Sequence, residues 1–114
     1  METLTLNRNN SGSLLMPMVN KTLCIDIDSI VRIEASSNYS KIYCNGQTLP
    51  IVVAKVLRWF EERLPQHSFA RVHRTHLVNK KYMVGIRNDK VILETGTQIS
   101  ISRRKKKTCW NNLS

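Results

Sequence analysis

One short run, residues 69–79 with the sequence FARVHRTHLVN, carries the side chains best suited to chemistry in this chain. It holds the basic residues Arg71, His73, Arg74 and His76 and has no acidic residue to offset them. The apolar residues around these groups can anchor both ends of the run in a core and leave the tripeptide HRT projecting. Arg, His and Thr side chains donate hydrogen bonds to phosphates and to base edges in a DNA groove. The run therefore indicates a contact with nucleic acid.

Other chemistries are poorly supported by residue type and spacing. His73 and His76 would present two metal ligands on a helix, but this segment has the character of a loop and a strand and brings no CxxC or acidic partner. The acids Asp26, Asp28 and Glu34 are interleaved with strand residues, away from any nucleophile turn. The sequence contains no glycine-rich phosphate loop and no GxSxG. We therefore predict no catalysis, no bound metal and no cofactor. A second interpretation of His73, beside an apolar residue, is a buried hydrogen-bonding partner.

The charge balance favours a polyanionic partner. The 114 residues, enough for one domain, contain 18 Lys and Arg against 8 Asp and Glu, for a net charge of +10. The basic residues cluster, and half of the net charge comes from residues 103–107, RRKKK. Such a surface attracts nucleic acid or an anionic membrane surface. The plainer alternative is a solvated basic surface.

Cysteine usage and hydropathy indicate where the protein works. Cys24, Cys44 and Cys109 are odd in number and widely separated, which suits free thiols in a reducing compartment. No apolar run is long enough for a membrane span, and none follows a basic start as in a signal peptide. We therefore predict a cytoplasmic protein.

Short strands dominate the hydrophobic pattern. Residues 1–19 are polar and are predicted to form a flexible arm that docks on an apolar patch through Leu14, Leu15 and Met16. Asn45-Gly46 predicts a tight hairpin, with residues 47–51 returning antiparallel to the strand before it. The strands predicted from alternation and turn residues are 23–28, 29–35, 39–44, 47–51, 82–87, 90–94 and 98–102.

One helix interrupts the strands. Val53, Val56 or Leu57, Phe60 and Leu64 recur at helical spacing, and Pro65 ends the helix. We interpret the aromatic pair Trp59–Phe60 as part of the core, with a platform for stacked bases as the less favoured alternative.

Four motifs together carry a family resemblance: IEASSNYSKIY, a helix ending in LP, FARVHRTHLVNKKYM, and KVILETGTQISISRRKKK. In these motifs the chain resembles the LytTR-type DNA-binding domain of bacterial transcription regulators, from about residue 21 to residue 107. The resemblance implies a mainly β fold: an elongated β-β-β arrangement of three small antiparallel sheets, about ten strands, with one short α-helix. It implies a LytTR-like domain at 20–107 between the arm (1–19) and a C-terminal tail (108–114).

The resemblance also implies how DNA is bound. Loops, in place of a recognition helix, would enter successive major grooves of double-stranded DNA. Arg74 would grip guanine O6 and N7 with two hydrogen bonds, whereas phosphate contact by Lys41 is favoured over base reading by Ser40. The predicted DNA-binding residues are Asn38, Ser40, Lys41, Arg71, His73, Arg74, Thr75, Arg103, Arg104 and Lys105.

Regulation and partners are further expectations from the resemblance. LytTR domains usually follow a receiver domain that takes a phosphate, and 114 residues leave no room for one. Control would then come from abundance, a separate regulatory protein or a membrane-bound inhibitor. Two copies on a direct repeat, as a homodimer on DNA, are also expected. An RNA-binding or ribosome-associated protein would expose more aromatic residues than the 6% found here. Composition leaves a protein-interaction module open.

Overall fold

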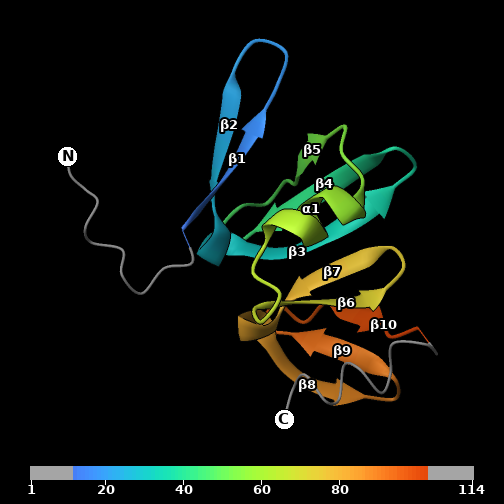
Figure 1. Ribbon diagram of the computed structural model, residues 1–114. Coiled ribbons are helices and arrows are strands. Elements are labelled where there is room, and N and C mark those ends of the chain that lie inside the picture. The colour runs from blue at the N-terminus through green and yellow to red at the C-terminus, as the bar shows by residue number, and fades with distance from the viewer. Residues whose placement is uncertain (1–11, 103–114) are drawn as a thin grey trace.

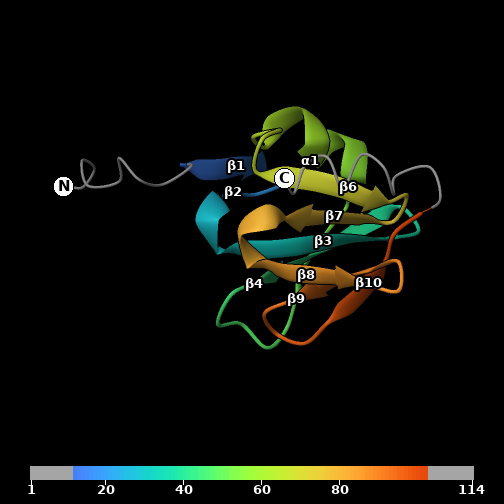
Figure 2. The same ribbon diagram turned by 90° about the horizontal axis from the view of Figure 1, so that it is seen from below.

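The computed structural model describes residues 12–102, which form ten strands in three antiparallel sheets and one α-helix. Figure 1 shows the sheets following one another along the molecule, whose principal extents are 45 × 33 × 26 Å. Figure 2 shows the helix and the last sheet on opposite sides of the central sheet. This arrangement confirms the predicted fold class of three small sheets, one short helix and a somewhat elongated shape.

The first sheet is a two-stranded ribbon. Strand β1 (Ser13–Pro17) pairs antiparallel with β2 (Thr22–Asp26), and Leu14 and Met16 on its inner face are buried. The prediction of a flexible arm is therefore wrong for Ser13–Pro17. Alternating apolar residues direct two side chains into the core while the backbone pairs with β2, and both effects hold the segment in place. Leu15, the third residue predicted to dock, points outward and is 60% exposed.

The central sheet has the strand order β5-β4-β3-β7-β6. Gly46 has a positive φ of 84°, so the turn predicted at Asn45-Gly46 is present. The strand returns later than predicted, however, because Ile51 and not Gln47 begins the pairing with β4. Pro50 has no N–H to donate to a strand ladder, which explains the longer loop. The strands are β3 (Ile30–Ser36), β4 (Tyr39–Cys44), β5 (Ile51–Val53), β6 (Phe69–His73) and β7 (His76–Asn79).

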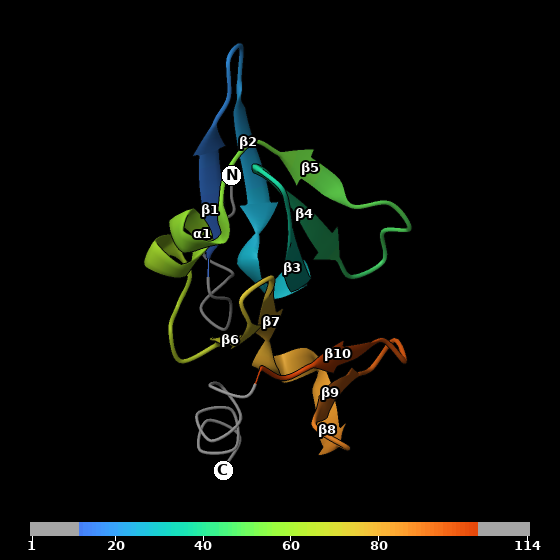
Figure 3. The same cartoon turned by 90° about the vertical axis from the view of Figure 1, so that its right-hand side faces the viewer.

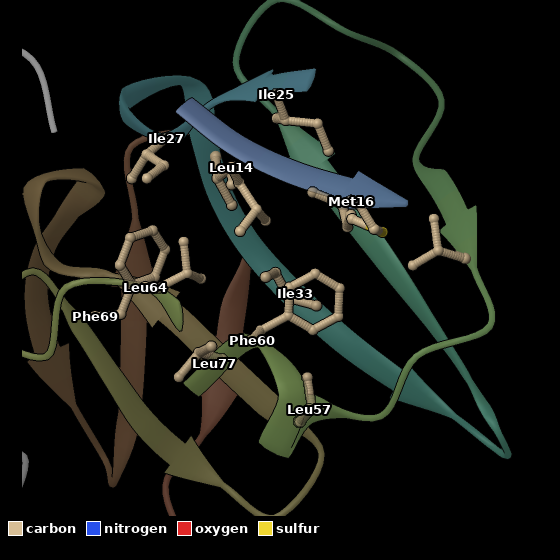
Figure 4. Close-up of a cluster of buried hydrophobic side chains, with 13 residues drawn as sticks. Leu14, Met16, Ile25, Ile27, Ile33, Leu57, Phe60, Leu64, Phe69 and Leu77 are labelled. Carbon is tan, nitrogen blue, oxygen red and sulfur yellow. The ribbon is translucent and has the colours of Figure 1, made fainter. Parts of the chain in front are cut away.

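The helix α1 (Leu57–Arg63) covers one face of the central sheet. It begins later than the apolar spacing predicted, because Val53 belongs to β5 and Val56 has extended angles. It ends as predicted before Pro65, where Leu64 is extended (φ −88°, ψ 151°). Figure 4 shows Phe60 among the buried side chains of the sheet and the ribbon. Phe60 is fully buried and Trp59 packs against the same cluster, as predicted.

The third sheet, of order β10-β9-β8, covers the opposite face. A second buried cluster, centred on Val72, Val78 and Val91, joins it to β6 and β7. Two long-range hydrogen bonds fasten the junction: Tyr82 Oη donates to Asp28 O (2.5 Å), and Asn79 Nδ2 donates to Ile30 O (2.9 Å). The strands are β8 (Met83–Arg87), β9 (Lys90–Leu93) and β10 (Gln98–Ser100), and short 3₁₀ turns lie at Ile27–Ser29 and Lys80–Tyr82.

Candidate nucleic-acid interface

Two of the three regions predicted to contact DNA lie side by side. Strand β3 pairs with β7, so that Glu34 lies opposite His76. Just beyond that pair, Ala35 N donates to Thr75 O at 2.8 Å. The β3–β4 turn, at residues 36–39, and the β6–β7 turn, at residues 74–75, therefore lie at the same end of the central sheet, on the right in Figure 1.

The chain reaches this same end again where β10 finishes. Ile101 N donates to Asp89 O and Ser102 N donates to Val72 O, both at 2.9 Å. Residues 101–102 thus run between the β8–β9 turn and strand β6. We call this end of the molecule the turn face (Figure 3): the β3–β4, β6–β7 and β8–β9 turns. Ser102 belongs to it through its hydrogen bond to Val72 O. Residues of the third predicted region, Arg103, Arg104 and Lys105, follow Ser102 in sequence and lie outside the described residues.

The β6–β7 turn carries Arg74 at its tip. His73 and His76 face each other across a two-residue connection, and the Arg74 side chain is exposed. Thr75 N donates to His73 Nδ1 at 3.2 Å, so this nitrogen accepts and the neutral imidazole carries its hydrogen on Nε2. Thr75 Oγ1 lies 2.8 Å from His73 Nδ1 and 3.0 Å from His76 Nδ1, which links the two rings. The turn is therefore fixed internally, with the Arg74 guanidinium and His73 Nε2–H as donors for a ligand.

Arg71 donates three hydrogen bonds within the protein. Its Nε donates to His73 O at 3.0 Å, its Nη2 to Arg74 O at 2.6 Å, and its Nη1 to Glu61 Oε1 at 2.5 Å. The side chain is only 23% exposed. The turn carbonyls and a carboxylate therefore occupy the Arg71 guanidinium, and its contact with DNA stays a prediction.

Two of the three residues predicted to contact DNA in the first region are accessible to solvent. Asn38 is exposed at the turn and Lys41 is half-buried near the start of β4. Ser40 is fully buried, and its Oγ donates to Lys55 O at 2.6 Å. The prediction that Ser40 contacts DNA is therefore wrong. Its side chain points toward the core side, since the residues of a strand alternate between the two faces of the sheet.

A network of charged side chains on β3, β4 and β7 lies next to the two turns. Arg32 Nη1 donates to Glu34 Oε1 at 2.9 Å, and the Arg32 guanidinium lies over the Tyr43 ring at 3.8 Å. Burial raises the pKa of Glu34, but the hydrogen bond and charge of Arg32, with His76 and Lys41, outweigh it and lower that pKa. Burial lowers the pKa of His76, and Arg32 and His73 add to this against the opposing effect of Glu34. Near neutral pH the network therefore holds a charged Glu34, balanced by Arg32, and a neutral His76.

One further turn carries basic residues that the sequence did not predict as DNA contacts. Asn88 and Asp89 have φ of 52° and 63°, as in the type I′ turns of two-residue hairpins. Arg87 and Lys90 flank this turn as a cross-strand pair, and both are exposed. The turn itself was predicted from Asn88-Asp89. Its position beside the end of β10 depends on long-range backbone hydrogen bonds, which no local pattern indicates.

Between residues 12 and 102 no group of three His, Cys, Asp or Glu side chains is placed to hold a metal ion. Within the same range no helix has the length and apolar character needed to cross a membrane.

Comparisons with known proteins identify the family and agree with the fold. The family model for the LytTr DNA-binding domain matches residues 20–113. A solved structure, the LytTr DNA-binding domain of a protein from Bacillus cereus, is similar with a TM-score of 0.74. The alignment covers 90% of this chain and 97% of that chain at 18% identity, so this likeness concerns the fold. The comparison with curated protein sequences gives no match.

The family match spans most of the chain. LytTR domains are non-catalytic DNA-binding domains of the response-regulator type, found in bacterial proteins, and DNA is therefore the partner of this domain. The matched range includes the three basic regions selected from the sequence. The chain belongs to the LytTR family of DNA-binding domains.

Proposed function

We propose that the protein is a sequence-specific transcription regulator that binds double-stranded DNA with its turn face. The observation that carries the proposal is the joining of the β3–β4 and β6–β7 turns through the β3–β7 pairing and the Ala35–Thr75 backbone hydrogen bond. This contact holds Asn38 and Lys41 beside Arg74 on one surface. Loops, and not the helix, would then enter the major groove, because α1 is packed on the central sheet through Leu57 and Phe60.

Arg74 is the residue that we assign to base reading. It is exposed at the tip of a short turn whose backbone is fixed by hydrogen bonds from Arg71 and within the His73–Thr75 pair. A guanidinium that projects from a backbone fixed in this way can donate two hydrogen bonds to guanine O6 and N7. The His73 Nε2–H suits a phosphate or an adjacent base edge.

The remaining basic residues would position the duplex. Lys41 and Asn38 lie on one side of Arg74, and Ser102 lies on the other, next to β6. Arg103, Arg104 and Lys105, which follow Ser102 in sequence, are the further basic residues that we assign to DNA. Arg103 is the second candidate for base reading. The three turns follow one another along the molecule in Figure 1. This row supports contacts with successive grooves. We add Arg87 and Lys90 as phosphate contacts at the far end of the row.

A second class of function, binding of single-stranded RNA, is less well supported. Such proteins stack unpaired bases on exposed aromatic rings. Trp59 lies edge-on to Phe60 with ring centroids 5.0 Å apart, and the Arg63 guanidinium lies 4.2 Å from its centroid. Its ring is therefore already covered by other side chains.

We further propose that two copies bind a direct repeat as a homodimer on DNA, and that a separate regulatory or membrane-bound inhibitor protein controls them.

Selection from random sequence tests the proposal. The protein would be incubated with random duplex DNA and random RNA at two salt concentrations, and the bound molecules would be separated by gel shift and sequenced. We expect enriched duplex motifs about one helical turn apart. Preference for RNA, or bound DNA without any enriched motif, would contradict the proposal. Retention of neither nucleic acid would favour a protein-interaction module.

A further inference from the structure

We propose that Arg71 and Glu61 form a positioning clamp that sets the β6–β7 turn for base reading while neither side chain touches DNA. The inference rests on the proposed function, in which Arg74 reads a base. It assigns a function to one face of α1, a helix that otherwise only packs on the sheet. It also makes an acidic residue a requirement for DNA recognition, although acids generally weaken the attraction to phosphates.

The hydrogen bonds of Arg71 account for the clamp. One guanidinium bridges the two carbonyls that bracket the reading residue, His73 O at 3.0 Å and Arg74 O at 2.6 Å. Both are backbone acceptors, so the contact fixes the path of the main chain on which the Arg74 side chain stands. A planar group with donors in a rigid fork holds such a geometry better than a flexible ammonium does.

Glu61 determines which way Arg71 points. Its Oε1 accepts from Arg71 Nη1 at 2.5 Å, and the two side chains are 35% and 23% exposed. A cavity of about 140 Å³ borders the pair and has Phe69 and Leu77 in its wall. This partly apolar setting strengthens the pair relative to one in open water. Without the carboxylate, the Arg71 side chain would turn toward solvent and toward DNA phosphates. The backbone carbonyls of the turn would then lose its hydrogen bonds.

The clamp connects α1 to the reading turn. Glu61 lies on the helix, and Arg71 lies on β6 opposite Leu77 of β7, so the pair joins the helix to the strands on which the turn is built. The ion pair therefore ties the position of the β6–β7 turn to α1.

The two possible roles of Glu61 predict opposite effects on DNA binding when its charge is removed. If the carboxylate acts only as a negative charge, Glu61→Gln should tighten binding to all DNA. If it holds the clamp, Glu61→Gln should lower the ratio of affinities for two duplexes: one selected from a random pool by the wild-type protein, and a shuffled duplex of the same composition. We expect a fall of about tenfold, within the range that one bidentate base contact supplies.

The matched control is the next residue along the helix. Glu62→Gln removes the same charge from a side chain that is 57% exposed and pairs with Arg58 and Arg63, away from Arg71. We expect it to leave the affinity ratio unchanged. Circular dichroism and thermal melting of each variant would establish that it is folded.

Arg71→Gln is the second variant, and the salt dependence of binding is its readout. A positioning residue should lower the affinity ratio while the slope of log affinity against log salt stays unchanged. A lost phosphate contact would instead weaken both duplexes equally and make the slope shallower by about 0.9. In the Arg74→Ala background, Arg71→Gln should have little further effect on the ratio, because the residue it positions is gone.

The outcomes separate the clamp from the proposed function. An unchanged ratio in Arg74→Ala would overturn base reading by Arg74, and the clamp with it. A lower ratio in Arg74→Ala with an unchanged ratio in Glu61→Gln would overturn the clamp alone. Equal weakening of both duplexes by Arg71→Gln, with the shallower salt slope, would show Arg71 to be a phosphate contact.

Discussion

The substitution Arg74→Ala, which removes one side chain, tests the role of the turn face most directly. The Arg74 side chain is exposed and donates no intramolecular hydrogen bond among those found in the described structure; only its backbone carbonyl is used, by Arg71. Its removal should therefore change the free energy of unfolding by no more than about 0.5 kcal/mol. Two hydrogen bonds to guanine would be lost, which costs about 1–3 kcal/mol, or roughly 5- to 150-fold in affinity for the selected duplex.

Fluorescence anisotropy with the selected and shuffled duplexes measures this loss directly. Arg74→Ala should weaken binding mainly to the selected duplex and relax the preference at one base position when the selection is repeated. Arg74→Lys keeps the charge and loses the fork, so it should bind shuffled DNA like the wild type while discriminating poorly. Lys21→Ala, in the turn between β1 and β2, is a control for loss of a positive charge away from the turn face. Equal weakening of both duplexes by Arg74→Ala would refute base reading and move it to Arg103.

Four further outcomes are expected. Log affinity should fall with log salt at a slope of roughly −5 to −7 if about six to eight phosphates are contacted, and a slope shallower than about −2 would mean that the cations are not at the interface. Phe60→Ala should lower the free energy of unfolding in urea by about 3–5 kcal/mol, and an unchanged midpoint would mean that the helix is not anchored by this ring. Ser40→Ala should lower the free energy of unfolding by about 1–3 kcal/mol, because Lys55 O loses its donor, and should leave the affinity ratio of the folded protein unchanged. A lower affinity ratio at unchanged stability would instead identify Ser40 as a DNA contact. Stability should fall on acidification in two steps. Neutral His76 stabilises the fold above about pH 6.5, and this stabilisation is lost as the pH falls toward its lowered pKa; the stabilisation from charged Glu34 is lost below about pH 4.5. His76→Asn should therefore remove the first step in melting curves measured from pH 7 to 4.

The strands could be predicted because their signals are local. β4 begins and ends where alternation placed it, and the β8–β9 turn lies at Asn88-Asp89. The errors occurred where a distant partner decides the outcome. Ser13–Pro17 becomes a strand because β2 pairs with it and the core accepts Leu14 and Met16. Its polar surroundings in the sequence could not indicate that partner.

Arg71 and Arg74 show the same limit within the site itself. Both are arginines in a single basic run, and composition, charge and spacing treat them alike. The pairing of β6 and β7 separates them, because Arg71 lies on a strand opposite Leu77 whereas Arg74 lies in the turn beyond the last pair. Glu61, ten positions upstream on α1, then holds the first guanidinium inward, while the second stays exposed. A basic motif therefore indicates how many cations a surface can offer. Which of them reach DNA is decided by the acceptors that the fold brings to each one.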